Sequence, residues 1–131
     1  MTVPQGHVLV VDDDDSIREV ATLALELVGG WKVSSAGSGK EALAVAREAQ
    51  PDAVLLDVMM PGMDGLTTLA HLREDPATAA IPVILMTAKA ATGEEPEWQG
   101  LDIAGVIAKP FDPMSLTTRV RELLDGQAAQ A

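Results

Sequence analysis

Residues 53–65 read AVLLDVMMPGMDG. Four apolar residues run up to a single carboxylate, Asp57, and a turn containing Pro61 and Gly62 follows. A short, continuous apolar run bounded by turn residues is typical of a β-strand that is covered on both faces. The stretch therefore predicts a buried strand of a parallel sheet that ends at an acidic side chain.

Similar apolar runs recur along the chain and alternate with helical patterns. The five runs are Val8–Val11, Lys32–Ser34, Ala53–Leu56, Val83–Met86 and Val106–Ala108. Capping signals precede the helical patterns: Ser16 with Glu19, Ser38 with Glu41, Asp64, and Asp112 with Pro113. Five strands alternating with five helices predict an α/β fold, a flavodoxin-like doubly wound (βα)5 with a five-stranded parallel sheet in the order 2-1-3-4-5.

The length of 131 residues fits one domain. We expect a single domain over residues 1–125 and a disordered tail over residues 126–131. The segment 92–100 contains Gly93 and Pro96, so the fourth helix is expected to be short or frayed.

Composition excludes several classes of function. The chain has no cysteine, which excludes disulfides, thiolate zinc sites and thiol catalysis. The formal net charge is −11 and the nine Lys and Arg residues are scattered, so direct nucleic-acid binding is not expected. No stretch has the roughly 18 apolar residues of a membrane span. The start of the chain lacks a secretory signal, so the expected location is cytoplasmic by default.

Polar side chains stand where the predicted strands end. These residues are Asp12 and Asp13 after the first strand, Asp57 after the third, Thr87 after the fourth and Lys109 after the fifth. Each alone has an ordinary structural explanation, such as an acid at a helix N-terminus or a lysine whose stem covers apolar surface. Because parallel strands end at one edge of the sheet, all five should converge on one crevice.

The converging groups favour a metal and a phosphoryl group. Three carboxylates in one cleft need a cation, and all-oxygen ligands suit Mg²⁺. We expect Asp13 and Asp57 to bind it directly, Asp12 to act more through water, and the backbone carbonyl of Met59 to complete the set. A carboxylate can also form an acyl phosphate, which Lys109 would neutralise and the Thr87 hydroxyl would contact.

These residues closely resemble the receiver domains of bacterial response regulators, the CheY-like superfamily. The matching stretches are Val10–Asp14, Leu55–Gly65, Met86–Ala88 and Ala108–Phe111, and the resemblance runs from about His7 to Leu124.

The resemblance implies a phosphorylation-activated switch of a two-component phosphorelay. Asp57 would be the phosphoacceptor, Asp12 and Asp13 would hold Mg²⁺, Thr87 would be the switch hydroxyl and Lys109 would sense the phosphoryl group. The Lys109–Pro110 peptide would be cis. A sensor histidine kinase or phosphotransfer protein would be the donor, and a downstream protein would be the target. Such a protein is not an enzyme for other substrates and catalyses only its own phosphorylation and autodephosphorylation.

Two features of the sequence depart from the pattern of the family. Many receivers carry an aromatic residue in the fifth strand that rotates on activation, and Val106 occupies that position here. The second departure is the weak fourth helix, which suggests an unusual partner or a mobile surface. The sequence leaves open whether an output domain belongs to the same protein.

Three other interpretations remain. A receiver-like scaffold that acts without phosphorylation is one, although all five key residues are present. An aspartyl-nucleophile phosphatase is another, since Asp12 and Asp14 have the spacing of haloacid dehalogenase-like enzymes, but the chain is short for a cap domain. A flavin-binding module shares the topology, but an acidic loop at residues 12–15 would repel the flavin phosphate.

Overall fold

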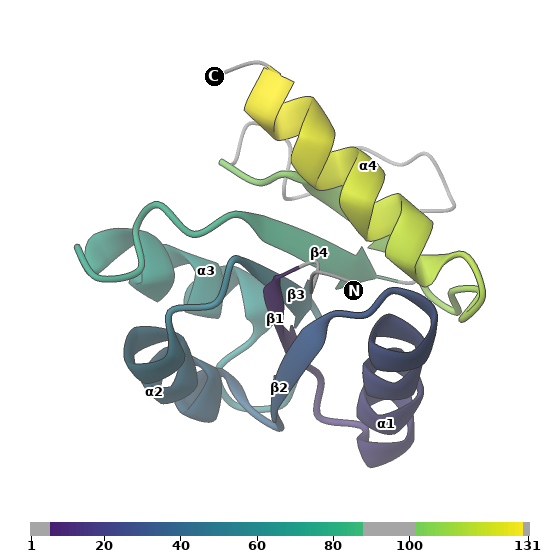
Figure 1. Ribbon diagram of the computed structural model, residues 1–131. Coiled ribbons are helices and arrows are strands. Elements are labelled where there is room, and N and C mark those ends of the chain that lie inside the picture. Colours follow the sequence, from purple (N-terminus) through teal and green to yellow (C-terminus); the bar gives the residue numbers. More distant parts are fainter. Residues whose placement is uncertain (1–5, 88–101, 130–131) are drawn as a thin grey trace.

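A computed structural model describes residues 6–87 and 102–129, and it shows a five-stranded parallel sheet with helices on both faces (Figure 1). The strand order β2-β1-β3-β4-β5 confirms the predicted topology. The strands are β1 (His7–Val11), β2 (Lys32–Ala36), β3 (Ala53–Asp57), β4 (Val83–Thr87) and β5 (Gly105–Ala108). The helices are α1 (Asp15–Leu23), continued by the π-helical turn η1 (Ala24–Val28), then α2 (Gly39–Ala49), α3 (Gly65–Glu74) and α4 (Leu116–Ala129).

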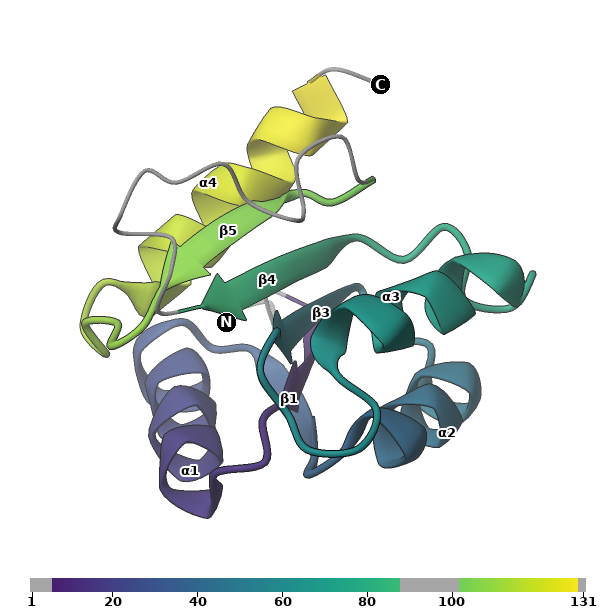
Figure 2. The same ribbon diagram turned by 180° about the vertical axis from the view of Figure 1, so that it is seen from behind.

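The helices form two layers. Helices α1 and α4 lie on one side of the sheet and α2 and α3 on the other (Figures 1 and 2). Neighbouring strand residues point to opposite layers: Val10 and Leu55 pack with the α1–α4 side, whereas Val11 and Leu56 pack with the α2–α3 side. Both faces of β1, β3 and β4 are therefore buried, which explains their continuous apolar runs.

The helix starts agree only in part with the capping predictions. Ser38 caps α2 by accepting from the Glu41 backbone N–H at 3.1 Å, and Asp64 caps α3 by accepting from the Thr67 N–H at 2.8 Å. The prediction that Ser16 caps the first helix was wrong. Asp14 is the cap, and its carboxylate accepts from the N–H groups of Ser16 and Ile17. An ionised carboxylate at the first turn also gains from the helix dipole.

The last helix differs from the prediction at both ends. Asp112 begins a turn, in which its carbonyl accepts from the Ser115 N–H, and α4 starts only at Leu116. The helix then runs to Ala129, past the expected end of the domain at residue 125. Gln127, Ala128 and Ala129 are residue types that favour helix, which accounts for the continuation past Gly126. The expected fourth helix, within residues 92–100, lies outside the described residues.

Among the described residues, no helix is long and apolar enough to cross a membrane.

Glycine 65 allows α3 to start directly against β3. A Cβ at Gly65 would stand 2.2 Å from the Asp57 carbonyl oxygen and 2.7 Å from the Val58 Cα, so backbone would have to move. We predict that Gly65→Ala lowers the free energy of unfolding by about 2 kcal/mol or more. Gly126→Ala is the matched substitution, because nothing lies within 4 Å of its Cβ position. It should raise stability by about 0.5–1 kcal/mol.

Urea unfolding of the two alanine variants and the wild type checks this prediction. A Gly65→Ala variant as stable as the wild type would contradict the close approach of α3 to the end of β3.

Candidate functional site

The structure brings the predicted residues to the carboxyl edge of the sheet. Asp57 and Thr87 are the last residues of β3 and β4, Asp12 follows β1 and Lys109 follows β5. Asp12, Asp57 and Thr87 are buried, each no more than 2% exposed, whereas Asp13 is exposed. The site is therefore a buried floor with one accessible carboxylate above it.

Backbone hydrogen bonds continue past the strand ends and fix these residues in register. The Asp12 N–H donates to the Ala36 carbonyl at 3.2 Å, and the Lys109 N–H donates to the Thr87 carbonyl at 3.1 Å. Asp57 lies opposite Met86 in the β3–β4 ladder. The side chains of the site thus project from rigid sheet positions, which holds them in place before any ligand binds.

Three carboxylates face a single ammonium group. Carboxylate oxygens of Asp12, Asp13 and Asp57 lie within 4.8 Å of one another. Lys109 Nζ lies 2.9 Å from Asp12 Oδ2 and 3.3 Å from Asp57 Oδ1. Lys109 therefore bridges the two buried acids and leaves negative charge in excess.

This environment changes the protonation of both partners. Burial, together with the negative charge of Asp12, raises the pKa of Asp57 to about 6, although Lys109 and the Met59 N–H act in the opposite direction. For Lys109, burial lowers the pKa, but the hydrogen bond to Asp12 and the charge of Asp57 outweigh it and the net shift is upward. Lys109 therefore stays charged, and the unfavourable environment of the site is reflected in the raised pKa of Asp57.

The donor set fits a hard cation. Carboxylate oxygens are the ligands that Mg²⁺ prefers, and the exposed side of Asp13 leaves room for the waters that Mg²⁺ retains. The loop after β3 begins with a local turn, in which the Met59 N–H donates to Asp57 Oδ1 at 3.2 Å. The role of the Met59 carbonyl stays a prediction.

Sequence reasoning missed Arg18. Its Nη1 donates to the backbone carbonyl of Asp12 at 2.7 Å, and its Nη2 pairs with the Asp15 carboxylate. The spacing of Asp15 and Arg18 on a helix was a visible signal for the ion pair. The contact with Asp12 depends on how the loop after β1 folds, which no spacing rule gives.

Comparison with known proteins identifies the family. The family model of the response regulator receiver domain matches residues 8–121. The chain belongs to the response regulator receiver domain family. It is 42% identical over 119 residues to the probable transcriptional regulatory protein TcrX of Mycobacterium tuberculosis, covering 89% of this chain and 49% of that protein. It is also 42% identical over 119 residues to the response regulator PleD of Caulobacter vibrioides, covering 90% of this chain and 26% of PleD.

Solved receiver structures share the fold. Chemotaxis response regulator CheY4 of Vibrio cholerae aligns with a TM-score of 0.82 at 30% identity, over 93% of this chain and 99% of that chain. The N-terminal domain of a response regulator receiver protein from Methanoculleus marisnigri aligns with a TM-score of 0.74 at 39% identity, over 93% and 95% of the two chains. This receiver domain spans half or less of the length of TcrX and PleD.

The chain is therefore a signalling protein, and its family implies a phosphoaspartate switch. The expected cis peptide between Lys109 and Pro110 is confirmed.

The raised pKa of Asp57 predicts a pH-dependent effect of Asp57→Asn. In the unfolded chain Asp57 ionises near pH 3.8, whereas in the folded chain it ionises near pH 6. Ionisation therefore costs the folded state more, and the contribution of Asp57 to the stability of the metal-free wild type falls as pH rises from about 4 to 6. Asparagine does not ionise, so the free energy of unfolding of the variant should rise relative to that of the wild type across this pH range. The difference should reach on the order of 2 kcal/mol at pH 7.

Urea unfolding in EDTA at pH 4, 5, 6 and 7 measures the difference in the free energy of unfolding between the two proteins. The contributions of the other titrating groups cancel in this difference. A difference that stays constant with pH, or that shrinks as pH rises, would contradict the electrostatic account of Asp57.

Proposed function

We propose that this receiver accepts a phosphoryl group on Asp57, with Mg²⁺ held by Asp12, Asp13, Asp57 and the Met59 carbonyl. The observation that carries the proposal is the position of Asp57. It is a buried carboxylate at the end of a central strand, 3.3 Å from Lys109 Nζ and next to two further acids. Among the acids of the described residues, only Asp57 and Asp12 combine burial, an ion pair with Lys109 and acidic neighbours that could hold a metal, and Asp57 is the one that ends the central strand β3.

The chain's own residues account for the transfer step. A carboxylate oxygen of Asp57 attacks the phosphorus of a phosphohistidine, an O–P bond forms, the P–N bond breaks and the imidazole leaves. Bound Mg²⁺ would neutralise charge on the phosphoryl oxygens. Lys109 already contacts Asp57 Oδ1, so a small movement of its flexible stem would bring Nζ to a phosphoryl oxygen.

Thr87 and Lys109 would convert the phosphoryl group into a change of conformation. Their backbones are joined by the Lys109 N–H to Thr87 carbonyl bond, so β4 and β5 respond together. Only the phosphorylated state offers phosphoryl oxygens to both side chains, which gives the two states different contacts and shifts the equilibrium. Val106 lies opposite Leu85 and packs against the core, and its short aliphatic side chain cannot repeat the rotation of an aromatic ring.

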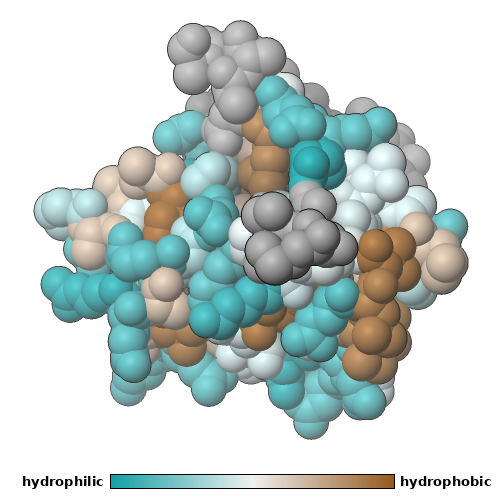
Figure 3. Space-filling model, in the orientation of Figure 1, coloured by the Kyte–Doolittle hydropathy of each residue, from teal (hydrophilic) through white to brown (hydrophobic). Residues whose placement is uncertain are grey.

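An apolar hollow beside the site suits a protein phosphodonor. It has a volume of about 440 Å³ and is lined by Ser16, Ile17, Val20, Lys109, Pro110 and Phe111. Further along the chain, outside this lining, Leu23 and Leu27 are also exposed, at 46% and 80%. Figure 3 shows hydrophobic surface over the region of α1. We propose that a histidine kinase or phosphotransfer protein docks here and presents its phosphohistidine to Asp57.

The output of the switch is proposed to be a protein contact. The chain carries a net charge of −11, which disfavours direct binding to nucleic acid. TcrX is named a transcriptional regulatory protein, but this chain matches only 49% of it. A downstream protein target is therefore the proposed partner.

Acetyl phosphate tests the phosphoacceptor. With Mg²⁺ the wild type should gain the mass of one phosphoryl group, and it should gain none in EDTA. Asp57→Asn should gain none under either condition, because the amide oxygen is a poor nucleophile. Intact-mass spectrometry makes the measurement. Magnesium-dependent labelling that persists in Asp57→Asn would place the acceptor elsewhere, and no labelling by either acetyl phosphate or a phosphohistidine donor would favour a scaffold that acts without phosphorylation.

Two lysine substitutions on one helix test the docking surface. Val20 lines the hollow, whereas Leu27 lies further along the helix and outside the lining, and both are exposed enough to tolerate lysine. The donor is a phosphotransfer protein that phosphorylates the wild type. Val20→Lys should slow transfer from this donor by about tenfold or more, since a contact of about 1.4 kcal/mol changes a rate or affinity tenfold. Leu27→Lys should change it less.

Labelling by acetyl phosphate should be equal in both lysine variants and in the wild type, which separates docking from chemistry. Equal protein-to-protein transfer rates for Val20→Lys and the wild type would exclude this hollow as the docking site.

A further inference from the structure

We infer that Arg18 is a positioning residue of the metal site, which acts by holding the main chain between Asp12 and Asp13. This inference rests on the proposed function, because it concerns the ligands proposed for Mg²⁺. The structure offers no direct contact between Arg18 and a carboxylate of the site, so its action has to pass through the backbone.

The two arms of the guanidinium have different partners. Nη1 donates to the Asp12 carbonyl at 2.7 Å, and Nη2 pairs with the carboxylate of Asp15 on the same helix. The side chain is 22% exposed, so the bond to the carbonyl is shielded from competing water. A planar group with two arms in fixed directions can hold one partner firmly while it bonds to another.

The carbonyl that Arg18 holds lies at the point where the chain leaves the sheet. The Asp12 N–H makes the bond to Ala36 that ends the ladder, and the Asp12 carbonyl belongs to the peptide group that leads into Asp13. On the far side of Asp13, the Asp14 N–H donates to Asp12 Oδ1 at 2.9 Å. Arg18 therefore fixes the orientation of the peptide plane on which the direction of the exposed Asp13 side chain depends.

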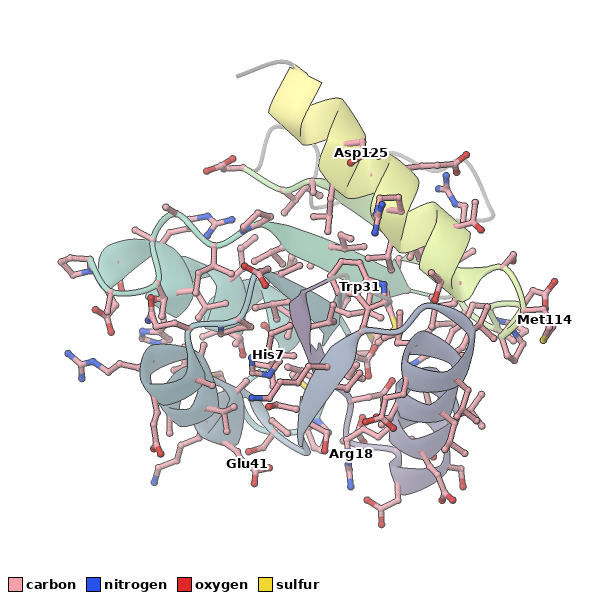
Figure 4. The ribbon with its side chains drawn as sticks, viewed as in Figure 1. His7, Arg18, Trp31, Glu41, Met114 and Asp125 are labelled. Carbon is pink, nitrogen blue, oxygen red and sulfur yellow. The ribbon has the colours of Figure 1, made fainter. Side chains whose placement is uncertain are left out.

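The neighbouring loop leaves space for this contact. A Cβ at Gly37 would stand 3.0 Å from Arg18 Nη1, tighter than an ordinary contact. The Gly37 N–H is itself held by Glu41 Oε1 at 2.6 Å, which anchors this loop to α2. Figure 4 shows Arg18 and Glu41 at the same edge of the fold, on helices that cover opposite faces of the sheet. The path from α1 to Asp12 is thus open because position 37 has no side chain.

Positioning and simple charge predict opposite effects on metal affinity. If Arg18 acted only as a nearby positive charge, its removal would strengthen Mg²⁺ binding, because a cation repels a cation. If Arg18 positions Asp12 and Asp13, its removal would weaken Mg²⁺ binding, as losing outer contacts of metal sites usually does. The sign of the change therefore distinguishes the two roles.

Calorimetric titration of Mg²⁺ into the purified variants makes the test. Arg18→Met should weaken binding by about tenfold, within the range for lost outer-sphere contacts. Arg18→Lys keeps the charge and can reach only one partner, so its dissociation constant should lie between those of Arg18→Met and the wild type. Asp15→Asn leaves the bond to the Asp12 carbonyl in place and should bind Mg²⁺ nearly as the wild type does.

Arg47→Met is the matched control for loss of one positive charge. Arg47 lies on α2, pairs with Asp75 at 3.3 Å and is 70% exposed, and it has no contact with the site. Its Mg²⁺ affinity should be unchanged or slightly higher than that of the wild type.

Amide hydrogen exchange of Asp14 in the metal-free proteins gives a second readout, independent of Mg²⁺. The Asp14 N–H bond to Asp12 Oδ1 should lose protection in Arg18→Met and keep it in Arg47→Met. Wild-type or tighter Mg²⁺ affinity in a folded Arg18→Met, or unchanged Asp14 protection, would overturn the inference. If Arg18→Met does not fold, wild-type affinity in Arg18→Lys would overturn it as well. A wild type that binds no Mg²⁺ would instead refute the proposed function, and the exchange of Asp14 would still decide the role of Arg18.

Discussion

Repulsion among Asp12, Asp13 and Asp57 is the constraint around which this receiver is built. Their oxygens lie within 4.8 Å of one another and a single lysine bridges the two buried ones. Such an arrangement is unfavourable by itself, and burial, together with the negative charge of Asp12, raises the pKa of Asp57. It persists because burial of an aliphatic core on both faces of the sheet supplies the stability that holds the strand ends together. The site is consequently poised to gain stability from a cation or from a change of charge on Asp57.

The sheet also connects the residues of the proposed switch. Asp57, Thr87 and Lys109 stand at the ends of strands that pair side by side, and the bond from the Lys109 N–H to the Thr87 carbonyl ties two of these ends together. A new group on Asp57 would therefore be contacted by neighbouring strands without rearrangement of the core. The proposed switch needs only small movements of side chains at the carboxyl edge, since the strands beneath are packed at both faces.

The fold and most of the site were predictable from sequence because both depend on periodicity and strand ends. Apolar runs predicted the strands, their alternation with helical patterns indicated the flavodoxin-like strand order, and Asp57, Thr87 and Lys109 followed from where those runs stop. Local choices were harder. Asp14 displaced Ser16 as the cap of α1, because an Asx-type contact depends on the exact path of the loop after β1. Arg18 was missed for the same reason, since a side chain that bonds to a backbone carbonyl leaves no pattern in the sequence.

With a pKa of about 6, Asp57 is expected to be partly protonated near pH 6 until a cation replaces the proton. Calorimetric titration with Mg²⁺ at pH 6, in two buffers of different ionisation enthalpy, measures this exchange directly. Binding should release about half a proton at pH 6 and almost none at pH 8, because a carboxyl with a pKa of about 6 is half protonated at the first pH and ionised at the second. Magnesium binding with no proton release at pH 6 would contradict this exchange, because it would show that burial and the charge of Asp12 do not hold a proton on Asp57.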